Sequence, residues 1–242
     1  MTVHPADFYT GIVPTVYAAL RGTHFGTDRY RAFIEQEGVP ALELGTGDAG
    51  PFFDLAEEGV DITGVDASID MVRRGRERLA SRGLDQQILH QRMEDLDLGR
   101  RFAAIYLAGP TFNLLADDET ARQALKAIAR HLLPTGAALV LLWVPSPTPA
   151  EEFGVVQTAD ADAVEARYVV ESEDFDTSTR TRTTSVRYEL GGDSQDVIEH
   201  RDWIIHWYDE ADFRRLAAGA GLTVSFEPID ASQVEATLRL AG

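Results

Sequence analysis

The residues most able to do chemistry stand in one short segment, residues 41–50, which reads ALELGTGDAG. Its apolar start predicts a buried strand, and Gly45, Gly47 and Gly50 follow in the G-x-G-x-x-G spacing, which lets a ligand approach the backbone at the mouth of a sheet. Glu43 stands two residues before the first of these glycines and puts a carboxylate beside that ligand. This arrangement suits a cofactor with a cationic ammonium and sulfonium better than it suits a pyrophosphate.

A second carboxylate follows at the end of the next apolar run, residues 60–65. Asp66 lies in GVDAS at 64–68, where its side chain can accept two hydrogen bonds from the diol of a ribose. Because the carboxyl ends of parallel strands meet at one edge of a sheet, we expect Glu43, the glycines and Asp66 to surround one adenosine-containing ligand. The structural alternatives are a tight turn for the glycines and a helix cap for Asp66.

The elements that must position these groups alternate along the chain. Apolar runs predict strands at 39–44, 60–65, 87–90, 103–107 and 137–144. Amphipathic patterns between them predict helices at 51–58, 69–81 and 118–133. A last helix at 209–220 and two strands at 222–228 and 234–240 complete the series. This order predicts an α/β protein with a mostly parallel sheet and helices on both faces.

Two segments fall outside this alternation. Helices are predicted at 8–20 and 28–37, and three antiparallel strands at 166–175, 179–190 and 196–207, the last two joined by the turn GGDSQ. We expect one domain over residues 1–242. In it, residues 1–38 form a helical cover, and residues 150–208 form an antiparallel β insertion over the active site.

Charge and composition exclude several functions. With 40 acidic and 22 basic residues the net charge is −18, which disfavours DNA, RNA and anionic membranes as partners. An acidic field would attract a cationic substrate such as an amine, although general solubility is the better explanation of the acidic charge. The absence of cysteine excludes disulfides, thiolate metal sites and cysteine nucleophiles. With no basic and apolar leader pattern at the start, we expect a cytoplasmic protein.

No metal site is predicted, because the six histidines are dispersed without ligand spacing. Nor does the chain contain a G-x-S-x-G elbow or a P-loop lysine, which argues against hydrolase and kinase chemistry.

Taken together, the motifs resemble those of the class I S-adenosylmethionine-dependent methyltransferases, and the resemblance covers nearly the whole chain. ELGTG at 43–47 is similar to the family's first motif, GVDAS at 64–68 with Met71 to its ribose-binding segment, and LLPTGAALVLLWV at 132–144 to a later one. The resemblance implies a Rossmann-like seven-stranded sheet of order 3-2-1-4-5-7-6 with strand 7 antiparallel. It also implies S-adenosyl-L-methionine as cofactor and S-adenosyl-L-homocysteine as product.

The resemblance extends to the residues that would hold this cofactor. The opening DFYTGIVPTVY resembles the small-molecule branch, in which tyrosines of an amino-terminal helix close over the cofactor, and the end of the fourth strand would face the sulfonium. The cofactor set so implied is Tyr9, Tyr17, Glu43, Gly45, Thr46, Gly47, Asp66, Ala67, Met71, Met93, Glu94, Leu107 and Ala108. Two positions depart from the family pattern. Arg92 replaces the usual acidic residue after the third strand, which moves adenine recognition to Met93 and Glu94, and Ala103 replaces a common aspartate.

Catalytic residues are less evident. Positioning and desolvation can supply most of the rate of methyl transfer to a good nucleophile, so no base is obligatory. If a base exists, His200, His206 or Glu199 in the segment EHRDWIIHWY is where we expect it, and strand alternation puts both histidines on one face. Asn113 is a candidate for orienting the substrate, with a turn or helix cap as its alternative.

We therefore expect a methyltransferase that acts on an N or O atom of a small metabolite, with an amino sugar or a natural-product amine favoured by the acidic charge. A nicotinamide-dependent oxidoreductase shares G-x-G-x-x-G, although Glu43 and the insertion argue against it. A protein that binds S-adenosylmethionine without transferring methyl, such as a cyclase, stays open because of Arg92 and Ala103. The sequence identifies neither the acceptor nor the oligomeric state.

Overall fold

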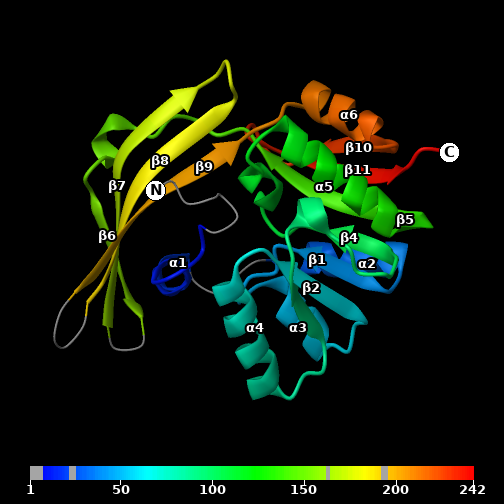
Figure 1. Ribbon diagram of the computed structural model, residues 1–242, viewed down its shortest axis with the longest axis horizontal. Coiled ribbons are helices and arrows are strands. Elements are labelled where there is room, and N and C mark those ends of the chain that lie inside the picture. Colours follow the sequence, from blue (N-terminus) through cyan, green and yellow to red (C-terminus); the bar gives the residue numbers. More distant parts are fainter. Residues whose placement is uncertain (1–7, 22–25, 162–163, 192–195) are drawn as a thin grey trace.

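Two β-sheets make up the frame of the molecule, and helix α1 lies between them (Figure 1). The computed structural model describes residues 8–21, 26–161, 164–191 and 196–242. One sheet has seven strands and carries helices on its faces, and the other has four strands and stands apart from it. None of the described helices is long and apolar enough to cross a membrane.

The seven-stranded sheet confirms the predicted order. Its strands are β1 (Ala41–Leu44), β2 (Ile62–Asp66), β3 (Gln87–His90), β4 (Phe102–Tyr106), β5 (Leu132–Trp143), β10 (Leu222–Pro228) and β11 (Gln233–Leu240). They are arranged as β10-β11-β5-β4-β1-β2-β3, and β11 is antiparallel to both of its neighbours. The carboxyl ends of β1, β2 and β4 therefore meet at one edge, which is where such sheets bind ligands.

Helices cover both faces of this sheet. On one face lie α2 (Asp28–Glu37), α3 (Pro51–Glu57) and α4 (Ile69–Arg82), and on the other lie α5 (Asp118–His131) and α6 (Glu210–Gly219). All four residues of β1 are buried, as expected for a central strand that is covered on both sides. In α5 the buried residues Ala121, Ala124, Leu125 and Ile128 recur at helical spacing, so this helix turns one apolar stripe to the sheet.

The boundary between α5 and β5 differs from the prediction. The helix ends at His131 and the strand begins at Leu132, whereas Pro134 and Gly136 were expected to separate a helix ending at 133 from a strand beginning at 137. The pairing of β5 with β4 shifts between Leu132 and Ala137, so Pro134 lies in an irregular stretch of the ladder, where proline is tolerated. Gly136 is needed because a Cβ there would lie 2.7 Å from the carbonyl oxygen of Ala103.

The antiparallel insertion forms a four-stranded sheet, which we call the roof. After a short turn η4 (Ala150–Glu152), its strands are β6 (Val156–Ala161), β7 (Val164–Asp176), β8 (Thr181–Leu190) and β9 (Val197–His206), paired in chain order. The sequence pattern predicted only the last three of these strands. The sequence of β6, VQTADA, has little apolar alternation. Residues 192–195, most of the predicted turn, lie outside the described residues.

The amino-terminal segment divides into two parts. Helix α1 (Val13–Arg21) begins five residues later than predicted and packs on the roof, where Val13 and Val16 join Val186 in one buried cluster. Helix α2 packs instead on the seven-stranded sheet, where Phe33 belongs to the core between that sheet and its helices. Of the expected cover, only the part up to α1 therefore lies against the roof.

Candidate active site

The glycine-rich loop leaves β1 in a conformation that favours glycine. Gly45 has φ 77° and Gly47 has φ 62°, both in the left-handed region. A side chain at position 45 would collide with Thr111, whereas a Cβ at position 47 would meet no protein atom within 4 Å. The backbone at Gly47 is therefore open to a ligand from the cavity that this loop borders.

Asp66 ends β2 directly beside this loop. Its Oδ2 accepts a hydrogen bond from the Gly47 amide at 2.8 Å, and its Oδ1 accepts one from the Ser68 amide at 2.8 Å. Burial raises the pKa of this carboxyl even though both hydrogen bonds lower it. Each oxygen retains a lone pair, so the carboxylate can still accept from two hydroxyl groups. Asp66 is not the cap of α4, because Ser68 caps that helix by accepting from the amide of Met71.

Glu43 lies in the wall of the same cavity and is 1% exposed. The hydroxyl of Tyr106 donates a hydrogen bond to its Oε2 at 2.7 Å, and Tyr30 stacks on Tyr106 with ring centroids 4.8 Å apart. Burial raises the pKa of Glu43 well above its usual range, against the hydrogen bond from Tyr106. A cation beside Glu43 would therefore favour its ionised form. Sequence reasoning did not identify Tyr106, because the last residue of a wholly apolar, buried strand indicates only a core residue.

One cavity brings these groups together. Its lining consists of Tyr9, Tyr17, Glu43, Gly45, Thr46, Gly47, Ala49, Val65, Asp66, Ala67, Met71, Gln91, Met93, Glu94, Ala108, Thr111, Leu114 and Leu115. Every residue of the predicted cofactor set except Leu107 lines it. Leu107 is buried instead in the core between the sheet and α5. Thr111 and Leu114 were missed because they come from a short turn, η3 (Thr111–Leu114), with no recognisable motif.

The amino-terminal segment is held over this cavity by the start of α4. The Ser68 hydroxyl donates to the carbonyl oxygen of Tyr9 at 2.5 Å, and the Gly11 amide donates to Oδ2 of Asp70 at 3.0 Å. The rings of Tyr9 and Tyr17 lie 5.0 Å apart at the cavity wall. The helix that follows Asp66 thus also positions Tyr9, on which Tyr17 packs.

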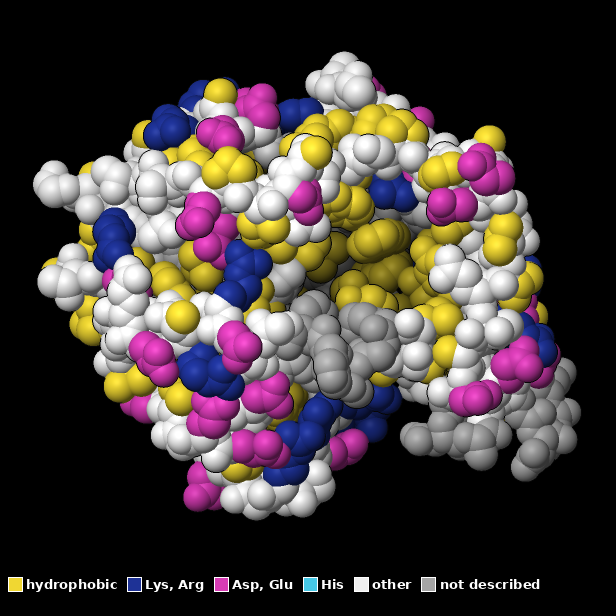
Figure 2. Space-filling view, turned by 180° about the vertical axis from the view of Figure 1, so that it is seen from behind, with side chains coloured by type: hydrophobic (Ala, Val, Ile, Leu, Met, Phe, Trp, Pro, Cys, Tyr) yellow, Lys and Arg dark blue, Asp and Glu magenta, His cyan; other side chains and the backbone are white. Residues whose placement is uncertain are grey.

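A second cavity lies under the roof and shares Tyr9 and Tyr17 with the first. We call the first the cofactor cavity and the second the roof cavity. The roof cavity is lined by Phe8, Tyr9, Tyr17, Leu20, Gln157, Tyr168, Tyr188 and Trp203. Figure 2 shows a hollow between the two halves of the molecule in which hydrophobic side chains gather. A substrate in the roof cavity would therefore adjoin a ligand in the cofactor cavity.

The predicted catalytic histidine His200 is not brought to either cavity. Trp203 lines the roof cavity, and strand alternation puts His200 on the opposite face of β9. There the His200 ring is exposed, and its Nδ1 lies 3.1 Å from Oε2 of Glu171. Glu199, the other acid–base candidate in this strand, forms an ion pair with Arg201 at 2.5 Å.

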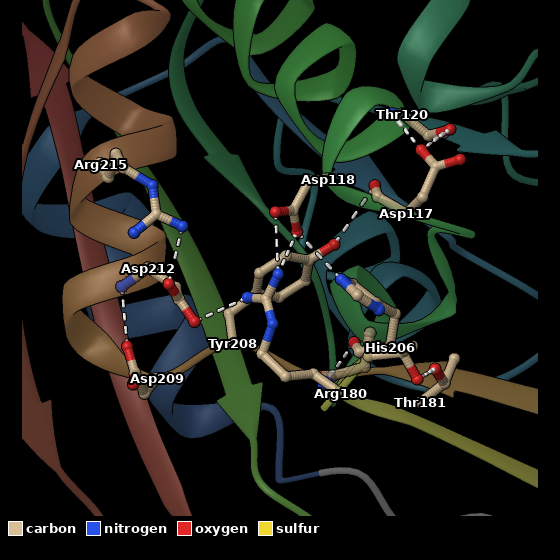
Figure 3. Close-up of polar contacts among 12 residues, drawn as sticks. Asp117, Asp118, Thr120, Arg180, Thr181, His206, Tyr208, Asp209, Asp212 and Arg215 are labelled. Carbon is tan, nitrogen blue, oxygen red and sulfur yellow. Dashed lines mark hydrogen bonds and ion pairs between the residues drawn. The ribbon is translucent and has the colours of Figure 1, made fainter. Parts of the chain in front are cut away.

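His206 and Asn113 are also outside both cavities, and both hold elements together. Nε2 of His206 lies 3.0 Å from Oδ1 of Asp118, in a group of charges that Arg180 completes (Figure 3). The amide of Asn113 donates to the carbonyl oxygens of Trp143 and His206, at 2.8 and 3.1 Å. Asn113 therefore joins the end of β5 to the end of β9. The structure thus corrects the expectation that these residues face the substrate.

Within the described part of the chain, no group of three or more His, Asp or Glu side chains is placed to hold a metal ion.

Comparison with known proteins agrees with this geometry. The methyltransferase-domain family matches residues 41–136, the segment that contains the glycine-rich loop and Asp66. The chain is 26% identical over 237 residues to dTDP-3-amino-3,6-dideoxy-alpha-D-glucopyranose N,N-dimethyltransferase of Streptomyces fradiae, covering 94% of this chain and 90% of that protein. It is 31% identical over 147 residues to the cypemycin N-terminal methyltransferase of a Streptomyces species, covering 60% of this chain and 55% of that one.

Solved structures share the fold over almost the full length. The CcbJ methyltransferase of Streptomyces caelestis superposes with a TM-score of 0.76 at 19% identity, covering 99% of both chains. A sugar N-methyltransferase of Streptoalloteichus superposes with a TM-score of 0.70 at 18% identity, covering 90% of both. The sheet order, the loop after β1 and the carboxylate after β2 define a nucleoside-binding fold of methyltransferase type. Residues 41–136 match the methyltransferase-domain family, and the chain is an S-adenosylmethionine-dependent methyltransferase, with S-adenosylmethionine as its cofactor.

Proposed function

We propose that this enzyme transfers a methyl group to the nitrogen of an amino group on a small molecule of the amino-sugar or natural-product type. The observation that carries the proposal is that the two cavities share Tyr9 and Tyr17 in their lining, which would put a small acceptor next to the cofactor. The Streptomyces relative that matches along almost the whole chain, an amino-sugar N,N-dimethyltransferase, supports an amine as the acceptor.

The residues of the cofactor cavity fit S-adenosylmethionine. Asp66 has free lone pairs for the ribose hydroxyls, the open backbone at Gly47 can lie against the amino-acid part, and Glu43 would favour a neighbouring cation. Met71 and Met93 supply apolar contacts on the side assigned to adenine. When bound, the cofactor supplies an electrophilic methyl group on positively charged sulfur. The tyrosine pair excludes water from one wall of that site.

Nitrogen is favoured over oxygen by what lines the cavities. A neutral amine attacks a methyl group without a base, whereas a hydroxyl needs one to remove its proton. Among the described residues, no histidine lines either cavity, and the predicted candidates His200 and His206 are engaged with Glu171 and Asp118. The ammonium product can lose its proton to water after it leaves, so the transfer step needs position rather than proton removal.

The test uses matched pairs of small molecules that differ only in an amino or a hydroxyl group at one carbon. Purified enzyme is incubated with S-adenosylmethionine and each compound, and mass spectrometry follows both the acceptor and S-adenosylhomocysteine. We expect the amino compounds to gain methyl groups and the hydroxyl compounds to stay unchanged. Methylation of the hydroxyl partners alone, or retention of the methyl group across all amino compounds, would refute the proposal.

We further propose that residues 1–242 act as one domain, in which the segment up to α1 and the roof complete the acceptor site. The charge of −18 supports small molecules, rather than nucleic acids or membranes, as partners. The absence of cysteine is consistent with our proposal that the enzyme works in the cytoplasm.

A further inference from the structure

The roof cavity has walls of uncharged aromatic rings. Tyr168 and Tyr188 meet edge to face with centroids 5.4 Å apart, and Phe8 stacks on Trp203 with centroids 6.4 Å apart. Burial raises the pKa of both tyrosines, so their hydroxyl groups stay neutral at physiological pH. Such walls favour an uncharged ring, which can lie against aromatic faces with little loss of hydration.

The arginines on the same face of the roof are each neutralised by a carboxylate. Arg182 donates to Glu173 at 2.6 Å, and both side chains are largely buried. Arg201 donates from its Nη2 to Glu199 at 2.5 Å, and its buried Nε has no acceptor among the described residues. A diphosphate entering from the cavity would have to displace one of these carboxylates or lie beside it, and both options cost free energy.

One polar group of the cavity wall lacks a partner. The indole Nε1 of Trp203 is buried and has no hydrogen-bond acceptor in the part of the chain that the structure describes. A buried donor without an acceptor is costly, and a ligand oxygen would remove this cost. The roof cavity therefore combines uncharged, mostly aromatic walls with one buried donor, that of Trp203, to which the described residues supply no acceptor.

We propose that the roof cavity binds the part of the acceptor remote from the reacting amine, and that this part is an uncharged ring next to an oxygen that accepts a hydrogen bond from Trp203, not a nucleoside diphosphate. The inference rests on the proposed function and narrows its substrate class. It separates this enzyme from its Streptomyces fradiae relative, whose name specifies a dTDP-linked amino sugar.

The first experiment compares two compounds that carry the same amino sugar. Calorimetry measures the binding of phenyl 3-amino-3,6-dideoxy-α-D-glucopyranoside and of dTDP-3-amino-3,6-dideoxy-α-D-glucopyranose to enzyme saturated with S-adenosylhomocysteine. We expect the phenyl glycoside to bind about tenfold more tightly, which corresponds to one displaced or crowded ion pair. Equal or tighter binding of the dTDP compound would overturn the inference, and so would binding of neither.

Two variants test which residues produce the expected preference for the phenyl glycoside. Trp203→Phe keeps an aromatic side chain, although a smaller one, and removes the donor, so the affinity for the phenyl glycoside should fall about fivefold, while that for S-adenosylhomocysteine stays unchanged. Trp207→Phe is the control, because Trp207 stacks on Phe175 and lines neither cavity. Glu199→Gln frees Arg201 and should raise the affinity for the dTDP compound several-fold. An unchanged affinity in either test variant would contradict the role given to its residue.

The two proposals fail in different ways. If the phenyl glycoside binds as expected but is never methylated, the assignment of N-methylation fails and the binding preference stands. If the dTDP compound is methylated and binds more tightly than the phenyl glycoside, N-methylation stands and the inference fails.

Discussion

The two cavities are built by different means, although they share a wall. In the cofactor cavity, the polar groups lie at the carboxyl ends of strands and in the loop after β1, and Asp66 is held by the backbone amides of Gly47 and Ser68. In the roof cavity, the lining comes from one side chain on each of the four roof strands and from the amino-terminal segment. Backbone geometry thus defines the first site, and side-chain packing defines the second.

This difference means that the two sites should respond to different substitutions. A change at a backbone-held carboxylate should affect cofactor binding strongly and leave the roof intact. A change in the contacts that hold the roof should affect the acceptor side and leave cofactor binding intact.

The largest effect is expected for Asp66→Asn. The amide replaces one acceptor with a donor that faces a backbone N–H, so hydrogen bonds to the loop and to the ribose are both lost. At about 1.5–3 kcal/mol for a hydrogen bond to a charged group, affinity for S-adenosylhomocysteine should fall about 100-fold, measured by calorimetry. The control is Asp61→Asn, because Asp61 is an exposed residue just before β2 that pairs with Arg100. An affinity within twofold of the parent enzyme would argue against the ribose role.

The next largest effect is expected in how the affinity for S-adenosylmethionine depends on pH, which Glu43→Gln should change. Since burial raises the pKa of Glu43 and a cationic cofactor favours the carboxylate, binding should release a proton below that raised pKa. Affinity for S-adenosylmethionine should therefore increase as pH rises toward it, by about tenfold per unit at most. The Gln variant should lose this slope. Calorimetry in buffers of different ionisation enthalpy counts the protons released on binding. Equal proton release in the parent enzyme and in Glu43→Gln would refute the assignment of this proton to Glu43.

Without cofactor, the same carboxyl should act on stability in the opposite direction. The folded protein holds this proton more tightly than the unfolded chain, so the contribution is fully present below the usual pKa of 4.5 and is lost as pH rises through the raised value. Denaturant titrations should show the parent enzyme losing stability relative to Glu43→Gln over that range. A constant difference between the two proteins would contradict the raised pKa.

A smaller effect is expected where the roof is fastened to the helices of the seven-stranded sheet. Arg180, at the turn between β7 and β8, donates to Asp118 of α5 and Asp212 of α6, at 2.7 Å in each case (Figure 3). Arg180→Ala should speed amide hydrogen exchange in β8 several-fold while affinity for S-adenosylhomocysteine stays within twofold. Arg215→Ala is the control, because this more exposed arginine also pairs with Asp212 but lies outside the turn. Unchanged exchange in β8 would show that Arg180 does not fasten the roof.

The smallest effect is expected at the tip of the same hairpin. Hydrogen bonds from the hydroxyl and amide of Ser178 lower the pKa of Asp176 to about 2. This stabilisation is present above the usual pKa of 3.8 and is lost as pH falls from there through about 2. A carboxyl titration followed by NMR should give the low value in the parent enzyme and a more ordinary one in Ser178→Ala. Equal values would refute the assignment.

The same contrast explains what could be predicted from the sequence. Glu43, the glycines and Asp66 lie within 24 consecutive residues at strand ends, so their contacts follow from a local pattern. The sheet order followed from the resemblance that these motifs carry. Tyr106 and Thr111 were missed because a core strand and a short turn carry no signal of what they face.

The roof could not be predicted in the same detail. Trp203 becomes a wall of the cavity only through its register with Thr184 and through contact with Phe8, nearly 200 residues earlier. The histidines of β9 drew attention by their type, but the face that meets α1 is the other one. Periodicity predicts that two faces exist, and only tertiary packing decides which of them is buried.

The wall shared by the two cavities has a thermodynamic consequence. Tyr9 and Tyr17 border both sites, and the start of α4 holds the backbone of Tyr9, on which Tyr17 packs. When one ligand has ordered these rings, the second ligand binds without that cost in conformational free energy. Because binding is a closed thermodynamic cycle, the resulting gain in affinity is the same whichever ligand binds first. The tyrosine pair thus makes cofactor and acceptor reciprocal effectors: each should bind more tightly when the other is already bound.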